Sequence, residues 1–135
     1  MTERACVMHL QLWLGTEIGL FFGPGRAELL ELIEYHGSLK KAAEELGMSY
    51  RAAWGKIKKT EAVLGNKLVE KKGSYKDGYR LTEYGKALTE KFRRWCNEVE
   101  EDALQKARTI FGLEIEKEEE KGPQIHRLSL SDPPL

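Results

Sequence analysis

Apolar residues recur at every third or fourth position between Ser38 and Gly65, a spacing that predicts two short helices separated by a tight turn. Ser38 is expected to cap the first helix, and Gly47 to end it in a left-handed conformation. The second helix restarts almost at once, with Ser49 as its expected cap. The buried sides of the two helices are expected to consist of Leu39, Ala42, Ala43, Leu46, Ala53, Ile57, Thr60 and Leu64. Two helices that cross closely through a short turn form a helix-turn-helix.

The exposed side of the second helix is rich in hydrogen-bond donors and flat rings. These side chains are Ser49, Tyr50, Arg51, Trp54 and Lys58. A recognition helix enters the major groove of DNA by its N-terminal end, where side chains must reach base edges and phosphates. We therefore predict that these residues bind DNA, although the spacing of Trp54 also permits packing beneath the helix. The competing interpretation is a small helical hairpin with a solvated basic face.

Two short strands are expected next, at residues 67–71 and 79–82, with a glycine-bearing loop between them. A hairpin directly after a recognition helix can lie along a neighbouring phosphate strand as a wing. The wing residues predicted to bind DNA are Lys71, Lys72, Tyr75 and Lys76. The alternative is a plain hairpin that only closes the core.

Before the helix-turn-helix, alternating apolar residues predict a β-hairpin over residues 7–22 that breaks at Gly15 and Thr16. This hairpin either covers the helical core or offers an edge to a second copy. The first is favoured, because a hairpin needs a partner layer to be stable. A helix is expected over residues 26–36, with its acidic residues facing solvent. Those acidic residues are Glu28, Glu31 and Glu34.

Thr82 is expected to cap a long helix over residues 83–111, a rod of about 44 Å at 1.5 Å per residue. A winged helix-turn-helix core is much shorter, so the helix either packs against its copy in a dimer or bends back over the hairpin. The dimer is favoured, because an apolar stripe on the helix would otherwise stay in contact with water. The residues predicted to form the dimer contact are Phe92, Trp95 and Val99.

Length and charge refine this picture. The 135 residues suit one domain, residues 1–111, and a charged tail, residues 112–135, which is expected to be flexible. A weaker alternative is that the tail docks on a partner through Ile125, Leu128 and Leu130. The net charge is zero, yet residues 50–80 carry nine basic against three acidic residues, and residues 98–121 carry nine acidic against four basic ones. A phosphate backbone senses local charge, so the basic segment agrees with DNA binding.

Other classes of protein find little support. Cys6 and Cys96 are far apart and the histidines are scattered, so we expect no metal site, no cofactor and no disulfide. There is no apolar run of about 18 residues and no signal peptide, which predicts a cytoplasmic protein without membrane contact. The sequence contains no nucleophile elbow, P-loop or zinc-protease motif, so we do not expect an enzyme. The expected fold class is mainly α with small β strands.

Three stretches carry a resemblance to a known family: FGPGRAELLELI from Phe22, GSLKKAAEELGMSYRAAW from Gly37, and KLVEKKGSYKDGYRLTEYG from Lys67. They resemble the N-terminal DNA-binding domain of the ModE family of molybdate-responsive regulators, a LysR-type winged helix-turn-helix. The resemblance covers roughly Leu10 to Val99, and MSYRAAW is its most specific run.

This resemblance implies that Ser49, Tyr50 and Arg51 begin the recognition helix and that Trp54 lies on it. It further implies a homodimer, built through the N-terminal strands and the long last helix, that regulates transcription at paired half-sites. A link to molybdate or oxyanion metabolism follows from the family. The chain ends where the family's molybdate-binding domains would begin, so their ligand residues cannot be carried over and the effector stays unknown.

The leading interpretation is a sequence-specific regulator of transcription that binds double-stranded DNA as a homodimer. The alternative is a winged-helix module for protein–protein interaction without specific DNA binding. The dependence of DNA binding on salt separates the two, because replacing counterions on phosphates gives a steep slope.

Overall fold

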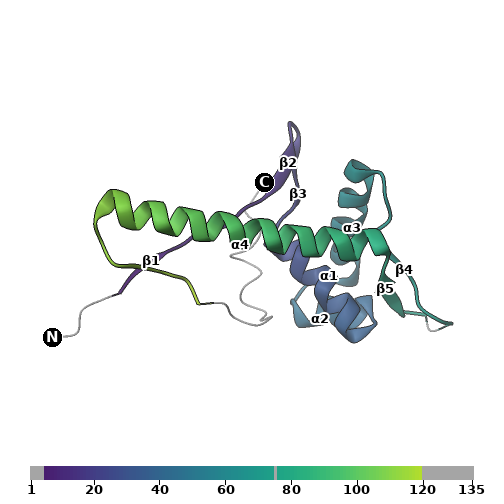
Figure 1. Ribbon diagram of the computed structural model, residues 1–135. Helices are drawn as coiled ribbons and strands as arrows, with labels where there is room; N and C mark the ends of the chain where they lie inside the picture. Colours follow the sequence, from purple (N-terminus) through teal and green to yellow (C-terminus); the bar gives the residue numbers. More distant parts are fainter. Residues whose placement is uncertain (1–4, 75, 120–135) are drawn as a thin grey trace.

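The computed structural model of the protein describes residues 5–74 and 76–119 (Figure 1). Along the chain its elements are β1 Cys6–Met8, β2 Leu14–Thr16, β3 Gly19–Phe22, α1 Pro24–His36, α2 Leu39–Glu45, α3 Tyr50–Leu64, β4 Val69–Lys71, β5 Tyr79–Leu81, α4 Glu83–Phe111 and β6 Ile115–Lys117. The short strands pair two by two: β1 with β6 in parallel, and β2 with β3 and β4 with β5 antiparallel. The predicted class, mainly α with small β strands in a winged helix-turn-helix, is confirmed.

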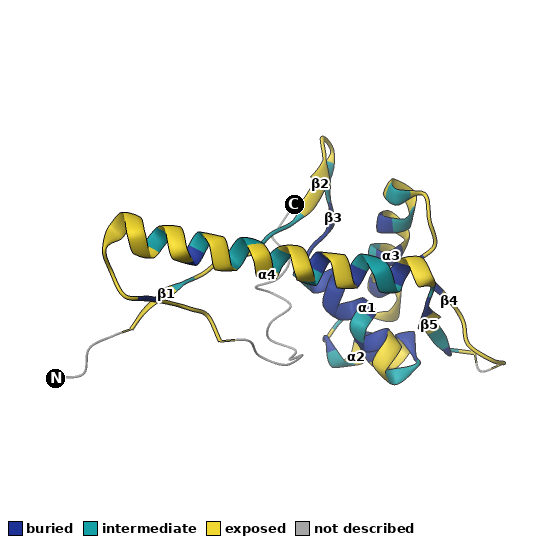
Figure 2. Ribbon diagram, in the orientation of Figure 1, coloured by how far each residue is buried: buried dark blue, intermediate teal, exposed yellow. Residues whose placement is uncertain are grey.

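The hydrophobic core lies where α1, α2 and α3 meet the wing strands and the first part of α4. Its largest fully buried side chains include Phe22, Leu29, Leu30, Ile33, Leu39, Leu46 and Leu68. Figure 2 shows the buried residues gathered in this region, whereas α4 exposes most of its far half. The ring of Phe22 packs edge to face on Phe92, with 5.1 Å between the ring centroids. This contact joins the long helix to the core.

The helix-turn-helix forms as predicted, with both caps in place. The hydroxyl oxygens of Ser38 and Ser49 each accept a hydrogen bond from the backbone N–H three residues on, at 3.1 and 3.0 Å. Gly47 closes the turn with a φ of 69°, a left-handed conformation that glycine adopts without steric strain. The sequence therefore fixes where α3 begins, and with it which side chains lie at its exposed end.

α1 begins two residues earlier than predicted, because Pro24 lies in its first turn, where the missing N–H costs no hydrogen bond. The prediction that its glutamates face solvent is wrong for Glu28 and confirmed for Glu34, which is exposed. Glu28 is only 4% exposed, and Glu31 accepts two hydrogen bonds from the Arg93 guanidinium of α4, at 2.9 and 2.7 Å. The helix contacts α2, α3, α4 and β5. Glu28 and Glu31 therefore have neighbours that helical spacing alone does not reveal.

The N-terminal hairpin is shorter than predicted and turns at a different place. Strands β2 and β3 meet through a turn at Glu17 and Ile18, so Gly15 and Thr16 lie within β2. Residues 9–13 lie in no strand. Every residue of β2 is exposed and only the end of β3 is buried. The hairpin therefore projects from the core beside α3 instead of forming a layer over it (Figure 1).

The long helix α4 has the predicted bounds and the predicted cap. The hydroxyl oxygen of Thr82 accepts the N–H of Gly85 at 3.0 Å. Beyond the core, residues 97–111 of α4 and the strands β1 and β6 form an extension that we call the distal arm (Figure 1). Leu104 and Ile115 are buried within it. The arm holds far fewer buried residues than the winged core.

The predicted tail departs from expectation at its start. Residues 115–117 form β6, which pairs in parallel with β1, Cys6 lying opposite Ile115. The chain thus returns along α4 after Gly112 and brings the two ends of the described chain together. The residues from 120 onward, including Ile125, Leu128 and Leu130, lie outside the described residues.

Gly85 marks a close approach between α4 and the wing. A Cβ at this position would overlap the backbone carbonyl of Leu68. We expect Gly85→Ala to lower the free energy of unfolding by about 1–3 kcal/mol, since the wing backbone must move. Gly55→Ala in α3 is the matched control, because no atom lies within 4 Å of its added Cβ. There the helix propensity of alanine should raise stability by about 0.5–1 kcal/mol. Urea unfolding measures both, and a stabilised Gly85→Ala protein would contradict the close approach.

Candidate nucleic-acid interface

The N-terminal end of α3 is exposed and carries the side chains predicted to read bases. Ser49 and Arg51 are exposed, and Tyr50 is 37% exposed. The hydroxyl of Ser49 caps the helix through its oxygen, which leaves its hydrogen for donation to another group. Within residues 5–74 and 76–119, the Arg51 side chain forms no hydrogen bond and no ion pair. Its guanidinium donors are thus available to an acceptor outside the protein, such as a guanine edge.

Trp54 lies between α3 and the wing, half-buried against the core. Its ring meets Tyr79 of β5 edge to face at 5.2 Å and Tyr50 at 6.5 Å between centroids. We call Tyr50, Trp54 and Tyr79 the aromatic bridge. The Nζ atom of Lys58 lies 4.9 Å from the centroid of the Trp54 ring, within the range of a cation–π contact. Packing is therefore an observed role of Trp54, whereas contact with DNA stays a prediction.

Backbone hydrogen bonds hold the wing against the start of the helix-turn-helix. The N–H of Tyr79 donates to the carbonyl of Gly37 at 3.1 Å, and the N–H of Leu39 donates to the carbonyl of Asp77 at 3.3 Å. These bonds join β5 and the end of the wing loop to the turn between α1 and α2. The wing loop therefore leaves the core from a base beside α2.

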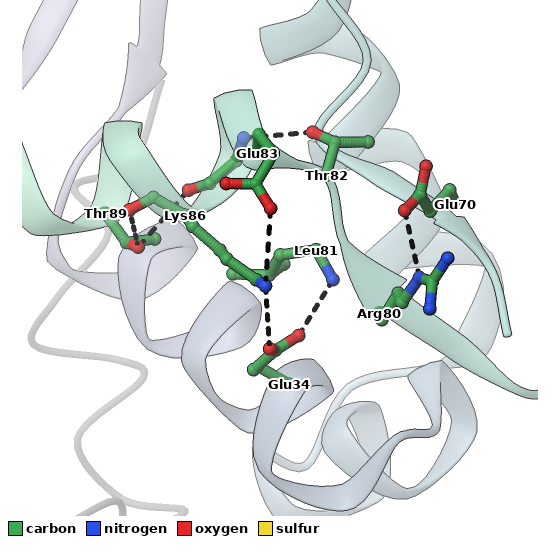
Figure 3. A network of polar contacts seen from close by, with 9 residues as sticks. Glu34, Glu70, Arg80, Leu81, Thr82, Glu83, Lys86 and Thr89 are labelled. Carbon is green, nitrogen blue, oxygen red and sulfur yellow. Dashed lines mark hydrogen bonds and ion pairs between the residues drawn. The ribbon is translucent and has the colours of Figure 1, made fainter.

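The base of the wing is also bonded to α1 and α4 (Figure 3). The Oε1 atom of Glu34 accepts the N–H of Leu81 at 2.9 Å, and its Oε2 atom lies 3.8 Å from Nζ of Lys86. Thr82 donates its hydroxyl to the carbonyl of Lys67 at 2.6 Å. Glu34 is thus an exposed carboxylate, as predicted, that also accepts a backbone hydrogen bond where β5 passes into α4.

The wing carries the predicted lysines on its surface. Lys71, Lys72 and Lys76 are exposed, whereas Tyr75 lies outside the described residues. The Nζ atom of Lys71 donates to the carbonyl of Lys76 at 2.6 Å and lies 5.0 Å from the centroid of the Tyr79 ring. Lys71 therefore braces the loop in addition to supplying charge.

Charge is separated along the molecule. The basic residues of the segment 50–80 lie on α3 and the wing, at one end of α4 (Figure 1). Residues 98–119, on the distal arm at the other end, include eight acidic and three basic residues. The candidate interface therefore forms the basic end of a chain whose net charge is zero.

Comparison with known proteins agrees with this geometry. Residues 26–86 match the bacterial regulatory helix-turn-helix proteins of the lysR family. The chain carries a LysR-type helix-turn-helix domain. The matched stretch begins in α1 and ends in the first turn of α4, so the LysR-type domain includes α2, α3 and the whole wing.

Curated relatives confirm the resemblance to the ModE regulators. The molybdenum transport protein ModE of Azotobacter vinelandii is 34% identical over 82 residues, which cover 59% of this chain and 30% of that protein. The DNA-binding transcriptional dual regulator ModE of Escherichia coli (strain K12) is 35% identical over 82 residues, which cover 59% of this chain and 31% of that protein. The chain thus spans about a third of the length of these relatives.

Among solved structures, the DNA-binding domain of CbnR in complex with DNA is similar to this chain at 24% sequence identity and a TM-score of 0.49. The similarity covers 63% of this chain and 93% of that one. A second is DarR of Vibrio fischeri in complex with DNA, at 22% identity and a TM-score of 0.49, covering 63% of this chain and 28% of that one.

Sequence reasoning missed Tyr79 within the LysR-type domain. The alternation of apolar and polar residues along β5 could have revealed it, because residues two apart in a strand share a face. Tyr79 is half-buried and Leu81 buried, with exposed Arg80 between them, which places Tyr79 on the side that packs inward. Burial raises the pKa of the Tyr79 hydroxyl, as do the charge of Tyr50 and a hydrogen bond with it.

The residues predicted to form a dimer contact differ in their surroundings. Phe92 is 3% exposed and packs on Phe22. The argument that its side chain would be exposed to solvent without a second copy is therefore wrong. Trp95 is 37% exposed, with its ring centroid 5.9 Å from that of Phe92. Val99, one turn on, is half-buried. Of the three predicted residues, Trp95 and Val99 are therefore the ones whose side chains a partner could contact.

The described part of the chain holds neither a metal-ligating cluster nor a helix that could cross a membrane. No group of three or more His, Cys, Asp or Glu side chains gathers there as metal binding would require. None of the helices described combines the length and the apolar composition needed to cross a membrane. Both cysteines are free thiols, and burial raises the pKa of the Cys96 thiol.

Proposed function

We propose that this chain is a regulator of transcription that binds double-stranded DNA in a sequence-specific manner, with α3 as its recognition helix. The observation that carries the proposal is the exposed N-terminal end of α3, where Arg51 has no partner among the described residues, beside a wing with exposed lysines. An arginine in this position can bind guanine through two hydrogen bonds in the major groove, while wing lysines neutralise phosphates. The relatives named above as regulators support this function, which would be performed in the cytoplasm without catalysis.

The proposal includes a homodimer on paired half-sites. A partner copy would cover Trp95 and Val99 on α4, which are partly exposed beyond the core. Two recognition helices about 34 Å apart would enter successive major grooves on one side of the duplex. A link to molybdate or oxyanion metabolism rests on the names of the relatives alone, of which this chain spans about a third.

Selection of bound sites from random double-stranded DNA tests the function. We expect an inverted repeat to emerge, and its affinity to fall steeply as salt increases. The alternative function, a winged-helix module that binds another protein, predicts that no sequence is enriched and that affinity for DNA is negligible at physiological salt. Such a result would overturn the proposal.

Arg51 and Lys72 are expected to contribute in different ways. Arg51→Ala should weaken binding to the selected site by about 1–3 kcal/mol and relax the preference at one base pair, because a bidentate base contact is lost. Lys72→Ala should weaken binding to all sequences alike, as expected for a phosphate contact. It should also reduce the slope of log affinity against log salt by about one unit. Fluorescence anisotropy with selected and random duplexes measures both. An Arg51→Ala protein with unchanged preference would show that Arg51 does not read a base.

A further inference from the structure

Tyr79 joins the wing to both helices of the helix-turn-helix. Its backbone N–H donates to the carbonyl of Gly37, directly before the cap of α2. Its side chain packs edge to face on Trp54 of α3, with an angle of 85° between the ring planes. The wing strands themselves are only three residues long, and so short a hairpin is marginal without packing. The position of the wing therefore depends on its contacts with the core, and those of Tyr79 reach α3.

The aromatic bridge also holds one cation from each element. Lys58 of α3 lies over the Trp54 ring and Lys71 of β4 lies over the Tyr79 ring, at 4.9 and 5.0 Å from the centroids. Both lysines are exposed and both belong to the predicted DNA-binding set. Because the two rings pack on each other, the bridge links the two cation–π contacts.

We propose that Tyr79 is a positioning residue, which fixes the wing relative to the recognition helix so that DNA meets one preformed surface. The inference rests on the proposed function and names the residue through which the wing lysines act. A preformed surface loses less conformational freedom on binding than a loose hairpin does. Tyr79 itself is not required to touch DNA.

Four variants separate positioning from other roles. Tyr79→Leu removes the ring, Tyr79→Phe keeps the ring and removes only the hydroxyl, and Tyr35→Leu is the control. Tyr35 lies on α1, is 81% exposed, and contacts the ring of His36. Trp54→Leu removes the same ring contact from the helix side and provides a second measurement if Tyr79→Leu fails to give a cooperative melting transition.

The readouts are the salt dependence of binding to the selected site and hydrogen exchange of the wing without DNA. Tyr79→Leu is expected to flatten the slope of log affinity against log salt by about one to two units, because each phosphate contact contributes about 0.9. The preference for selected over random DNA should persist. The amide of Leu39, which donates to Asp77, should exchange at least about tenfold faster relative to core amides. Tyr79→Phe and Tyr35→Leu should match the wild type in both readouts.

An unchanged slope in Tyr79→Leu or its substitute Trp54→Leu overturns the inference. A slope flattened to the same extent in Tyr79→Phe also overturns it, since the hydroxyl and not the ring packing would then be responsible. Uniformly faster exchange of all amides would assign Tyr79 to global stability only and overturn it as well. Failure of the proposed function is distinct: the wild-type protein itself would then show no salt-dependent binding to any duplex, and the inference would fall with it.

Discussion

Phe92→Ala is expected to lower the free energy of unfolding by about 3–5 kcal/mol, the range for removing a buried phenylalanine ring. Phe92 is 3% exposed and packs edge to face on Phe22, which is itself fully buried. The substitution leaves a cavity between α4 and the end of β3 and removes an aromatic pair. Because small domains are stable by only about 5–15 kcal/mol, this loss should bring the protein close to unfolding.

Chemical denaturation measured by circular dichroism checks this result, and Phe111→Ala on the same helix is the control. Phe111 is 69% exposed, so its removal should change stability by less than about 0.5 kcal/mol in the monomer. Equal losses in the two variants would show that Phe92 has no special role in joining α4 to the core.

Trp95→Glu is expected to convert the proposed homodimer to a monomer, because an unpaired carboxylate would be placed in an apolar contact. Affinity for a full inverted repeat should then fall by about 10²–10⁴, the gain that two linked sites provide. Affinity for a single half-site should stay the same. Sedimentation velocity and anisotropy measure the two quantities on the same samples.

Tyr84→Glu is the matched control, since Tyr84 lies on the same helix and is also 37% exposed. It should remain dimeric, because it lies in the first turn of α4, away from the proposed contact. Melting curves of both variants check that the fold is kept. A wild-type protein that sediments as a monomer at micromolar concentration would contradict the dimer, and a dimeric Trp95→Glu protein would contradict the role of Trp95.

Elements defined by local signals were predicted correctly from the sequence. Ser38, Ser49 and Thr82 each precede an apolar pattern of helical period, and each caps a helix in the structure. A cap involves only backbone groups within the next turn, so its chemistry is visible in a few adjacent letters. The bounds of α4 were predicted to the residue for the same reason, as Thr82 and Gly112 delimit it.

Features that depend on distant neighbours were missed. Glu31 and Glu34 recur at a spacing that indicates a solvated helix face, yet their partners are Arg93 and the backbone of Leu81, about fifty to sixty residues on. Pairing of β1 with β6 brings together segments over a hundred residues apart, and three-residue strands leave too little alternation to predict it. Of the candidate interface, the exposed donors could be found from helical spacing, whereas the aromatic bridge required the packing of β5 on α3.

The separation of charge gives this neutral chain a large electric dipole, directed along α4. The helix spans about 44 Å, while electrostatic screening acts over about 8 Å at physiological ionic strength. The electric fields of the basic and acidic ends therefore do not cancel each other. DNA attracts the basic end, whereas its repulsion of the acidic end is screened. In dilute salt, where the screening length approaches about 30 Å, repulsion of the acidic end would add a torque. The molecule would then rotate before contact, so that α3 and the wing reach the duplex first.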